Sequence, residues 1–106
     1  AQYGGGLYLE SSSNNAISGS VYGNIAYNGG GLYFGFSPNN TISGSVYSNR
    51  AQYGGGLYLN NSDYFTNSGW ITNNRAYGTG GGVYTNGAHT NSSFGKVLYN
   101  TPSNFN

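Results

Sequence analysis

The stretch AQYGGGLYLE at residues 1–10 decides the fold, because the chain repeats it almost unchanged at residues 51–60 as AQYGGGLYLN. Related stretches begin at Ala26 (AYNGGGLYFG) and at Ala76 (AYGTGGGVYT). Units of 25 residues therefore start at positions 1, 26, 51 and 76, and the fourth carries one extra residue near Thr79. A repeat of this length predicts an array of stacked structural units.

The composition excludes several classes of protein. Glycine, asparagine and serine supply 20, 17 and 14 of the 106 residues, whereas charged residues make up only 5% and the net charge is +1. A nucleic-acid-binding protein needs a basic surface, which this chain lacks. No apolar run is long enough to span a membrane, and no cysteine is present to form a disulfide scaffold. With so few aliphatic residues, we expect order to come from regular backbone pairing between the repeats.

Superposition of the units aligns equivalent residues in columns. Short runs such as GLYL and TISGSVY alternate between apolar and polar or aromatic residues, which predicts about three short strands in each unit. We expect an all-β fold, a parallel β-helix (β-solenoid) that forms a single domain. Its coils 1 to 4 would span residues 1–25, 26–50, 51–75 and 76–101, followed by a C-terminal tail at 102–106. The apolar columns are Leu7, Leu32, Leu57 and Val83, and Val21, Val46, Ile71 and Val97.

The alternation also predicts which side chains fill the core. Leu7, Leu9, Ile17 and Val21 would point inward and Tyr8 outward, because successive side chains of a strand lie on opposite faces. Polar Asn67 and Ser93 stand where the first two units have isoleucine, which leaves the register of the second strand open in the C-terminal half.

The segments NIAYNGGGLY, NRAQYGGGLY and NRAYGTGGGVY share the pattern NxAxxGGGxY, the last with its one-residue insertion. This pattern resembles the repeats of right-handed parallel β-helix proteins, which include polymorphic outer-membrane and autotransporter-type adhesins of bacteria. The resemblance covers residues 1–101. It implies the fold and leaves the activity open, because the same fold also carries polysaccharide lyases and purely structural stalks.

The glycine triplets and a column of asparagines could each be either a binding site or a structural element. A phosphate-binding glycine loop would lead into a helix, usually with a lysine after it, whereas these triplets lead into strands. We therefore expect the glycines to form tight corners. The asparagine column could be a polar binding row, but we expect a structural amide ladder that hydrogen-bonds from coil to coil. Its members are Asn24, Asn49, Asn74 and Asn100.

The tyrosine column is expected to form an exposed aromatic row, and three uses of it remain open. The rings could stack on one another, pack against another protein, or bind sugar or ice. Ice binding is the least favoured, since the usual rows of threonine are missing. The row comprises Tyr8, Tyr33, Tyr58 and Tyr84.

Catalytic and metal-binding residues are not expected. Acid–base hydrolysis needs a positioned pair of carboxyl groups, and the single aspartate (Asp63) and single glutamate (Glu10) fall in different columns. Asp63 and His89 share a column, which predicts a surface contact rather than a dyad. One histidine without cysteine gives no metal-ligand set, so we predict no cofactor. Arg50 and Arg75 would be a solvated pair, or would face an acceptor on another subunit.

The ends of the array suggest a function. The chain begins at a repeat and only PSNFN follows the last one, so we expect two uncapped ends. Coil 4 could stack head-to-tail on coil 1 of another copy and so build a filament, or the chain could be a piece of a longer adhesin; we favour the filament. The alternative is an adhesin or carbohydrate-binding module that binds polysaccharide or other cell-surface material through the tyrosine row. The residues expected to meet in end-to-end assembly are Ala1, Tyr3, Leu7, Tyr84, Val97 and Tyr99.

The absence of methionine and the small residue at position 1 predict a processed chain from which a signal peptide has been removed. We therefore predict a secreted or cell-surface structural protein that binds copies of itself. We do not expect an enzyme, a nucleic-acid-binding protein or insertion into a membrane.

Overall fold

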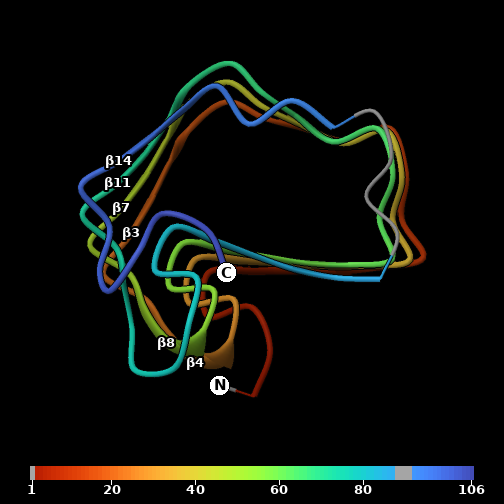
Figure 1. The fold of residues 1–106 in the computed structure, drawn as a ribbon. Helices are drawn as coiled ribbons and strands as arrows, with labels where there is room; N and C mark the ends of the chain where they lie inside the picture. Colours follow the sequence, from red (N-terminus) through yellow and green to blue (C-terminus); the bar gives the residue numbers. More distant parts are fainter. Residues whose placement is uncertain (1, 88–91) are drawn as a thin grey trace.

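The computed structural model describes residues 2–87 and 92–106, and within them every regular element is a β-strand. Seen along the axis, the chain winds through four coils that lie one upon the other (Figure 1). All strand pairs between neighbouring coils are parallel. The expected parallel β-solenoid is confirmed.

The strands form four narrow sheets along the solenoid. The first contains β1 (Leu7–Glu10), β5 (Leu32–Gly35), β9 (Leu57–Asn60) and β13 (Val83–Asn86). The second contains β2 (Ala16–Ile17), β6 (Thr41–Ile42) and β10 (Thr66–Asn67). The third contains β3 (Ser20–Tyr22), β7 (Ser45–Tyr47), β11 (Trp70–Thr72) and β14 (Lys96–Leu98). The fourth contains β4 (Ile25–Asn28), β8 (Arg50–Tyr53) and β12 (Arg75–Ala76).

A complete coil thus has four strand segments, one more than the three expected from the sequence. The additional segment is β4 at the start of coil 2 and β8 at the start of coil 3, just before the glycine triplets of these coils. Its sequence is short and lies between a turn and a corner, so alternation alone does not distinguish it from a connection. Backbone pairing with the neighbouring coil makes it a strand.

The predicted register is observed. Leu7 pairs with Leu32, Leu32 with Leu57, and Leu57 with Val83. The offset between coils 3 and 4 is 25 residues at Ala51 and Ala76 but 26 at Leu57 and Val83. The extra residue is therefore absorbed between Ala76 and Val83, close to the expected position.

The core is made of inward-facing residues on the sheets, as the alternation predicted. Leu32, Ile42, Val46, Leu57 and Ile71 are fully buried. The coil 1 residues Leu7, Leu9, Ile17 and Val21 also face the core, but they are only partly buried. Burial of aliphatic and aromatic side chains stabilises the fold by about 1.5–3 kcal/mol per fully buried residue.

The glycine triplet forms a corner that bends toward the inside of the coil (Figure 1). Its first residue has a positive φ in each repeat, for example +67° at Gly29. Its third residue lies close to the next coil and to the asparagine column. A Cβ on Gly31 would stand 2.7 Å from the Gly56 carbonyl oxygen and 3.0 Å from Nδ2 of Asn49. The triplet is therefore a tight corner, as expected.

The remaining corners turn through the left-handed backbone region at repeated positions. One such column has Gly23 in coil 1, Ser48 and Asn73 in coils 2 and 3, and Tyr99 in coil 4, with φ between 54° and 70°. Glycine adopts this conformation without steric cost, whereas a tyrosine does not. The fold therefore holds Tyr99 in a strained conformation.

The open question about the second strand is resolved by a shift of one residue in coil 4. Asn67 keeps register with Ile42 and is buried, with Nδ2 donating to the Phe94 carbonyl at 2.7 Å. Ser93 pairs with Thr66 rather than with Asn67 and remains exposed. Phe94 packs against the core in its place.

Candidate assembly interface

The asparagine ladder is the main polar structure of the solenoid. In each step, the backbone N–H and the side-chain Nδ2 of one asparagine donate to Oδ1 of the asparagine in the next coil. For Asn49 and Asn74 both donor–acceptor distances are 3.0 Å. Nδ2 of Asn49 also donates back to the Val21 carbonyl of the preceding coil, again at 3.0 Å. The predicted ladder is confirmed, and Asn49, Asn74 and Asn100 are buried.

The ladder has a direction, which makes its two ends different. Between asparagines, the backbone N–H and one Nδ2 hydrogen donate toward the following coil, and each Oδ1 accepts from the preceding coil. Nδ2 of Asn24, in coil 1, donates to Asn49 at 3.1 Å and to the Tyr22 carbonyl of its own coil at 3.0 Å. Within residues 2–87 and 92–106, no donor approaches Oδ1 of Asn24 in the way that Asn24 approaches Asn49.

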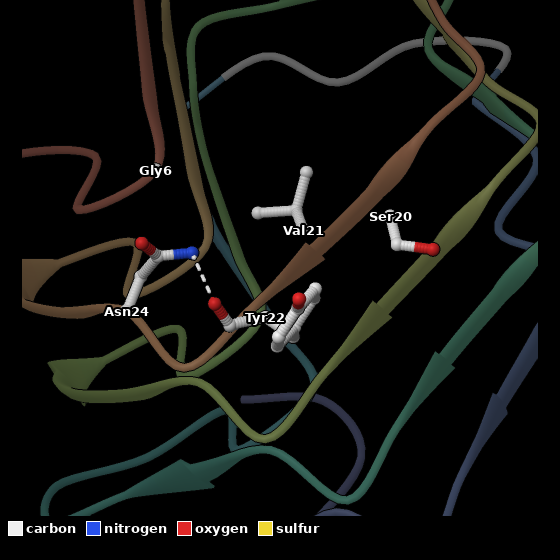
Figure 2. A pocket seen from close by; sticks show the side chains of 5 residues that line it. All are labelled: Gly6, Ser20, Val21, Tyr22 and Asn24. Carbon is white, nitrogen blue, oxygen red and sulfur yellow. Dashed lines mark hydrogen bonds between the residues drawn. The ribbon is translucent and has the colours of Figure 1, made fainter.

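A cavity of about 280 Å³ opens beside this end of the ladder. Figure 2 shows the side chain of Asn24 at one side of it, directed to the Tyr22 carbonyl, with Val21 pointing into the solenoid. In later coils the equivalent place is occupied by the coil before. Lining residues are Gly6, Ser20, Val21, Tyr22 and Asn24.

The opposite end of the ladder is closed by the segment 103–106. The backbone N–H and Nδ2 of Asn100 donate to Oδ1 of Asn104 at 3.1 and 3.0 Å. The N–H groups of Gly82 and Val83 donate to the carbonyls of Ser103 and Asn104. The expectation of an uncapped C-terminal end is therefore wrong for the part of coil 4 that contains β13, because this segment lies on it as a partial fifth rung.

The rest of the C-terminal end is less well covered. Thr101 pairs with Arg75, after which Pro102 leads the chain away from β12. A cavity of about 500 Å³ remains there, lined by Arg75, Ala76, Tyr77, Gly78, Thr101 and Pro102. The exposed Arg75 guanidinium lies 5.2 Å from the centre of the Tyr77 ring.

The tyrosine row forms, but its middle is not exposed. Neighbouring rings lie 5.3, 5.1 and 4.7 Å apart between centroids from Tyr8 to Tyr84. Tyr33 and Tyr58 are only 6% and 9% exposed. The expected continuous exposed face is thus wrong at these two positions, since the rings cover one another and Tyr3 covers Tyr33 at 4.9 Å.

Burial changes the acidity of the two inner rings. It raises the pKa of Tyr33 above its ordinary value, although the hydrogen bond that Asn60 donates to its hydroxyl acts in the opposite direction. Burial raises the pKa of Tyr58 as well. Burial therefore favours the neutral form of both phenols, in agreement with their position inside a packed stack of rings.

The residues expected in end-to-end assembly lie at both ends, with different accessibility. Tyr3 is 38% exposed and Leu7 is partly buried in coil 1. In coil 4, Tyr84 is half-buried and Tyr99 is 76% exposed, but Val97 is only 6% exposed. Val97 is thus a core residue rather than an accessible contact. Ala1 lies outside the described residues.

Two side-chain arrays were not predicted. Serines at one corner form a second ladder, in which the Ser12 N–H donates to Ser37 Oγ and the Ser37 N–H to Ser62 Oγ, each at 3.0 Å. The spacing of 25 residues was a visible signal for it. Phenylalanines from different columns also stack through the core at 5.6, 5.7 and 5.4 Å between centroids, and repeat alignment gives no signal for that. The stack runs Phe34, Phe65, Phe94 and Phe105.

The sequence also led to expectations for an arginine pair, for a contact between Asp63 and His89, and for metal ligands and membrane spans. Arg50 and Arg75 are paired neighbours and both are exposed, in agreement with a solvated corner. The predicted contact between Asp63 and His89 involves a residue outside the described part of the chain. In the described part, no three histidine, aspartate or glutamate side chains gather as metal ligands would. No helix there could cross a membrane.

Comparison with protein-family models, with curated proteins and with solved structures gives no match to this chain.

Proposed function

We propose that this chain is an extracellular structural protein whose copies stack head-to-tail into a filament. One observation carries the proposal: coil 1 presents, uncovered among the described residues, the same amide and apolar columns that join the coils within the chain. The partner that best fits such a surface is a coil with the same columns. Coil 4 of a second copy is such a coil.

The apolar side chains of coil 1 favour a partner. In coils 2 and 3 the same columns are fully buried, whereas in coil 1 they are only partly buried. Covering this face would remove apolar surface from water at about 25 cal/mol per Å². The side chains concerned are Leu7, Leu9, Ile17 and Val21.

Among the described residues, the backbone of coil 1 also offers an edge without a partner strand. In coil 2 the N–H groups of Thr41 and Ser43 donate to the carbonyls of Asn15 and Ile17 in coil 1. The equivalent N–H groups of coil 1, on Ala16 and Ser18, are directed to the side where a preceding coil would lie. Open strand edges of this kind readily pair with another chain.

The two ends of the asparagine ladder carry complementary hydrogen-bonding groups, donors at one end and an acceptor at the other. Coil 4 directs the Asn100 donors toward the C-terminal end, and coil 1 offers Oδ1 of Asn24 as an acceptor at the other. Head-to-tail contact would continue the ladder in its existing direction. Because the two surfaces are different, the contact does not close on itself and extends into a filament.

The proposed location outside the cell rests on the sequence. The chain is poor in charge and rich in glycine, asparagine and serine. Its NxAxxGGGxY pattern resembles the repeats of polymorphic outer-membrane and autotransporter adhesins. A sugar-binding role for the tyrosine row has less support, because Tyr33 and Tyr58 are covered.

The test compares Ile17→Lys with the matched control Ser13→Lys. Ile17 faces the end of the core and is only partly buried, so its lysine can reach solvent in a single copy. In a stacked pair the ammonium would be buried without a partner, which costs several kcal/mol. Ser13 is exposed at a corner of the same coil.

Sedimentation velocity and negative-stain microscopy should show concentration-dependent filaments for Ser13→Lys and single particles for Ile17→Lys, with equal circular dichroism spectra. The same measurements are made on Asn104→Leu, which frees the Asn100 donors. Discrete particles at every concentration, for both the unaltered chain and Asn104→Leu, would refute the proposal.

A further inference from the structure

We infer that the C-terminal end of coil 4 is a binding site for an extended peptide strand with an Asn–Phe pair. The segment 103–106 fills this site within the same molecule. Coil 1 of a second copy would compete for it, and this last step rests on the proposed function. Segment 103–106 would then be a displaceable cap that sets the concentration at which stacking begins.

The backbone of the segment follows the path of a fifth coil. Gly82 N–H donates to the Ser103 carbonyl at 3.3 Å and Val83 N–H donates to the Asn104 carbonyl at 2.8 Å. One coil earlier, Gly56 and Leu57 donate to Gly81 and Gly82 in the same way. Addition of a strand to an exposed sheet edge is a general mode of peptide recognition.

Asn104 fills two positions that are filled by separate residues in a complete coil. Its backbone takes the position of the third glycine of a triplet, and its side chain takes the position of the ladder asparagine. This is sterically feasible because the two positions touch: a Cβ on Gly82 would stand 2.6 Å from Nδ2 of Asn100. One residue can therefore reach both, and this explains how so short a segment satisfies the ladder.

Phe105 and Asn106 also take positions that a fifth coil would fill. Phe105 pairs with Val83 in the leucine column, and its ring lies 5.4 Å from Phe94 at the end of the core stack. The side-chain amide of Asn106 accepts from the Thr85 N–H at 2.8 Å and donates to the Thr85 carbonyl at 3.0 Å. It thus replaces the backbone of a further strand residue.

The segment covers less than a coil would, which makes its displacement feasible. Among the described strands its backbone pairs with β13 alone, Phe105 remains 44% exposed, and the cavity beside β12 stays open. Coil 1 of another copy could pair with all four sheets. A ligand that binds the same surface more extensively displaces the smaller one once its concentration is high enough.

Hydrogen exchange on the full chain tests the site in its own molecule. Asn104→Leu removes the Oδ1 acceptor, whereas Asn104→Asp keeps an acceptor oxygen and is the matched control. Loss of two hydrogen bonds should speed exchange of the Gly82, Val83 and Asn100 amides by about tenfold or more. Asn104→Asp should change it much less. Unchanged protection in Asn104→Leu would overturn the inference.

A fluorescent peptide, Thr-Pro-Ser-Asn-Phe-Asn, tests the site between molecules. Anisotropy should show that it binds Asn104→Leu, whose own segment is released, at least several-fold more tightly than it binds the unaltered chain. A peptide with leucine in place of its first asparagine should not bind. Failure of the peptide to bind Asn104→Leu would overturn the inference.

Filament formation is measured separately from peptide binding. If the peptide binds and also suppresses filaments of Asn104→Leu, both the site and the competition are supported. If the peptide binds but no variant forms filaments, the strand-binding site is supported and head-to-tail stacking is refuted.

Discussion

Replacement of Asn49 by alanine should be among the most destabilising substitutions in the chain. The buried side chain takes part in four hydrogen bonds: Oδ1 accepts from the N–H and Nδ2 of Asn24, and Nδ2 donates to Val21 and Asn74. At about 1 kcal/mol for each bond, Asn49→Ala should lower the free energy of unfolding by about 4 kcal/mol. That is a large fraction of the roughly 5–15 kcal/mol typical of a domain.

The matched control is Asn24→Ala at the uncovered end of the same ladder. The Asn24 side chain donates two hydrogen bonds, to the Tyr22 carbonyl and to Asn49 Oδ1, and the first of these is exposed to solvent. Its removal should cost about 1 kcal/mol, and the Asn24 backbone N–H would still donate to Asn49. Urea unfolding should show a large fall in midpoint for Asn49→Ala and a small one for Asn24→Ala, with equal slopes.

Asn49→Asp tests whether this side-chain position needs a hydrogen-bond donor. The new carboxylate would face the Val21 carbonyl and Asn74 Oδ1, so the ladder favours its protonated form and raises its pKa in the folded state. Stability should therefore be lowest at neutral pH and should recover as the pH falls through that raised value. Equal losses for Asn49→Ala and Asn24→Ala, or no recovery of Asn49→Asp in acid, would refute the account of a directional ladder.

Three further predictions concern the core, the tyrosine row and a strained corner. Phe65→Ala should cost about 3–5 kcal/mol in urea unfolding, because the ring is buried between Phe34 and Phe94; a loss below 1 kcal/mol would contradict the core stack. The raised pKa of Tyr33 contributes stability that is complete below the ordinary tyrosine value of 10.0 and is lost as the pH rises through the raised value. Tyr33→Phe should therefore weaken this alkaline loss, measured by circular dichroism during base titration, and an unchanged profile would disprove the role of this phenol. Tyr99→Gly should raise the thermal midpoint, with a gain of about 1 kcal/mol, because Tyr99 holds a φ of 60° while 76% exposed; a lower midpoint would contradict the strain.

The repeat itself made most of the architecture predictable. A spacing of 25 residues places Leu7, Leu32 and Leu57 in one line whatever the details of the turns, and the period-two alternation decides which side they face. The amide ladder follows from the same spacing. Glycine triplets that precede strands predict tight corners, and the positive φ at Gly29 agrees.

The sequence did not predict features that depend on contacts between different columns. The phenylalanine stack joins Phe34, Phe65 and Phe94 from non-equivalent positions, so no alignment of repeats brings them together. The burial of Tyr33 depends on Tyr3, which pairs with Asn28 of β4 on the other side of the glycine corner and lies 4.9 Å from the Tyr33 ring between centroids. Alternation correctly placed the tyrosines outside the core, but it could not show what covers them.

The chain by itself determined the coil, because each repeat carries its own turns, its own apolar columns and an amide that pairs with the next copy. Only the tertiary structure decided how the ends differ. The C-terminal cap depends on the contact between the Gly82 position and Asn100, which lets Asn104 act as backbone and ladder together. Such a coincidence of two surfaces is a property of packed coils, and no pattern along one strand encodes it.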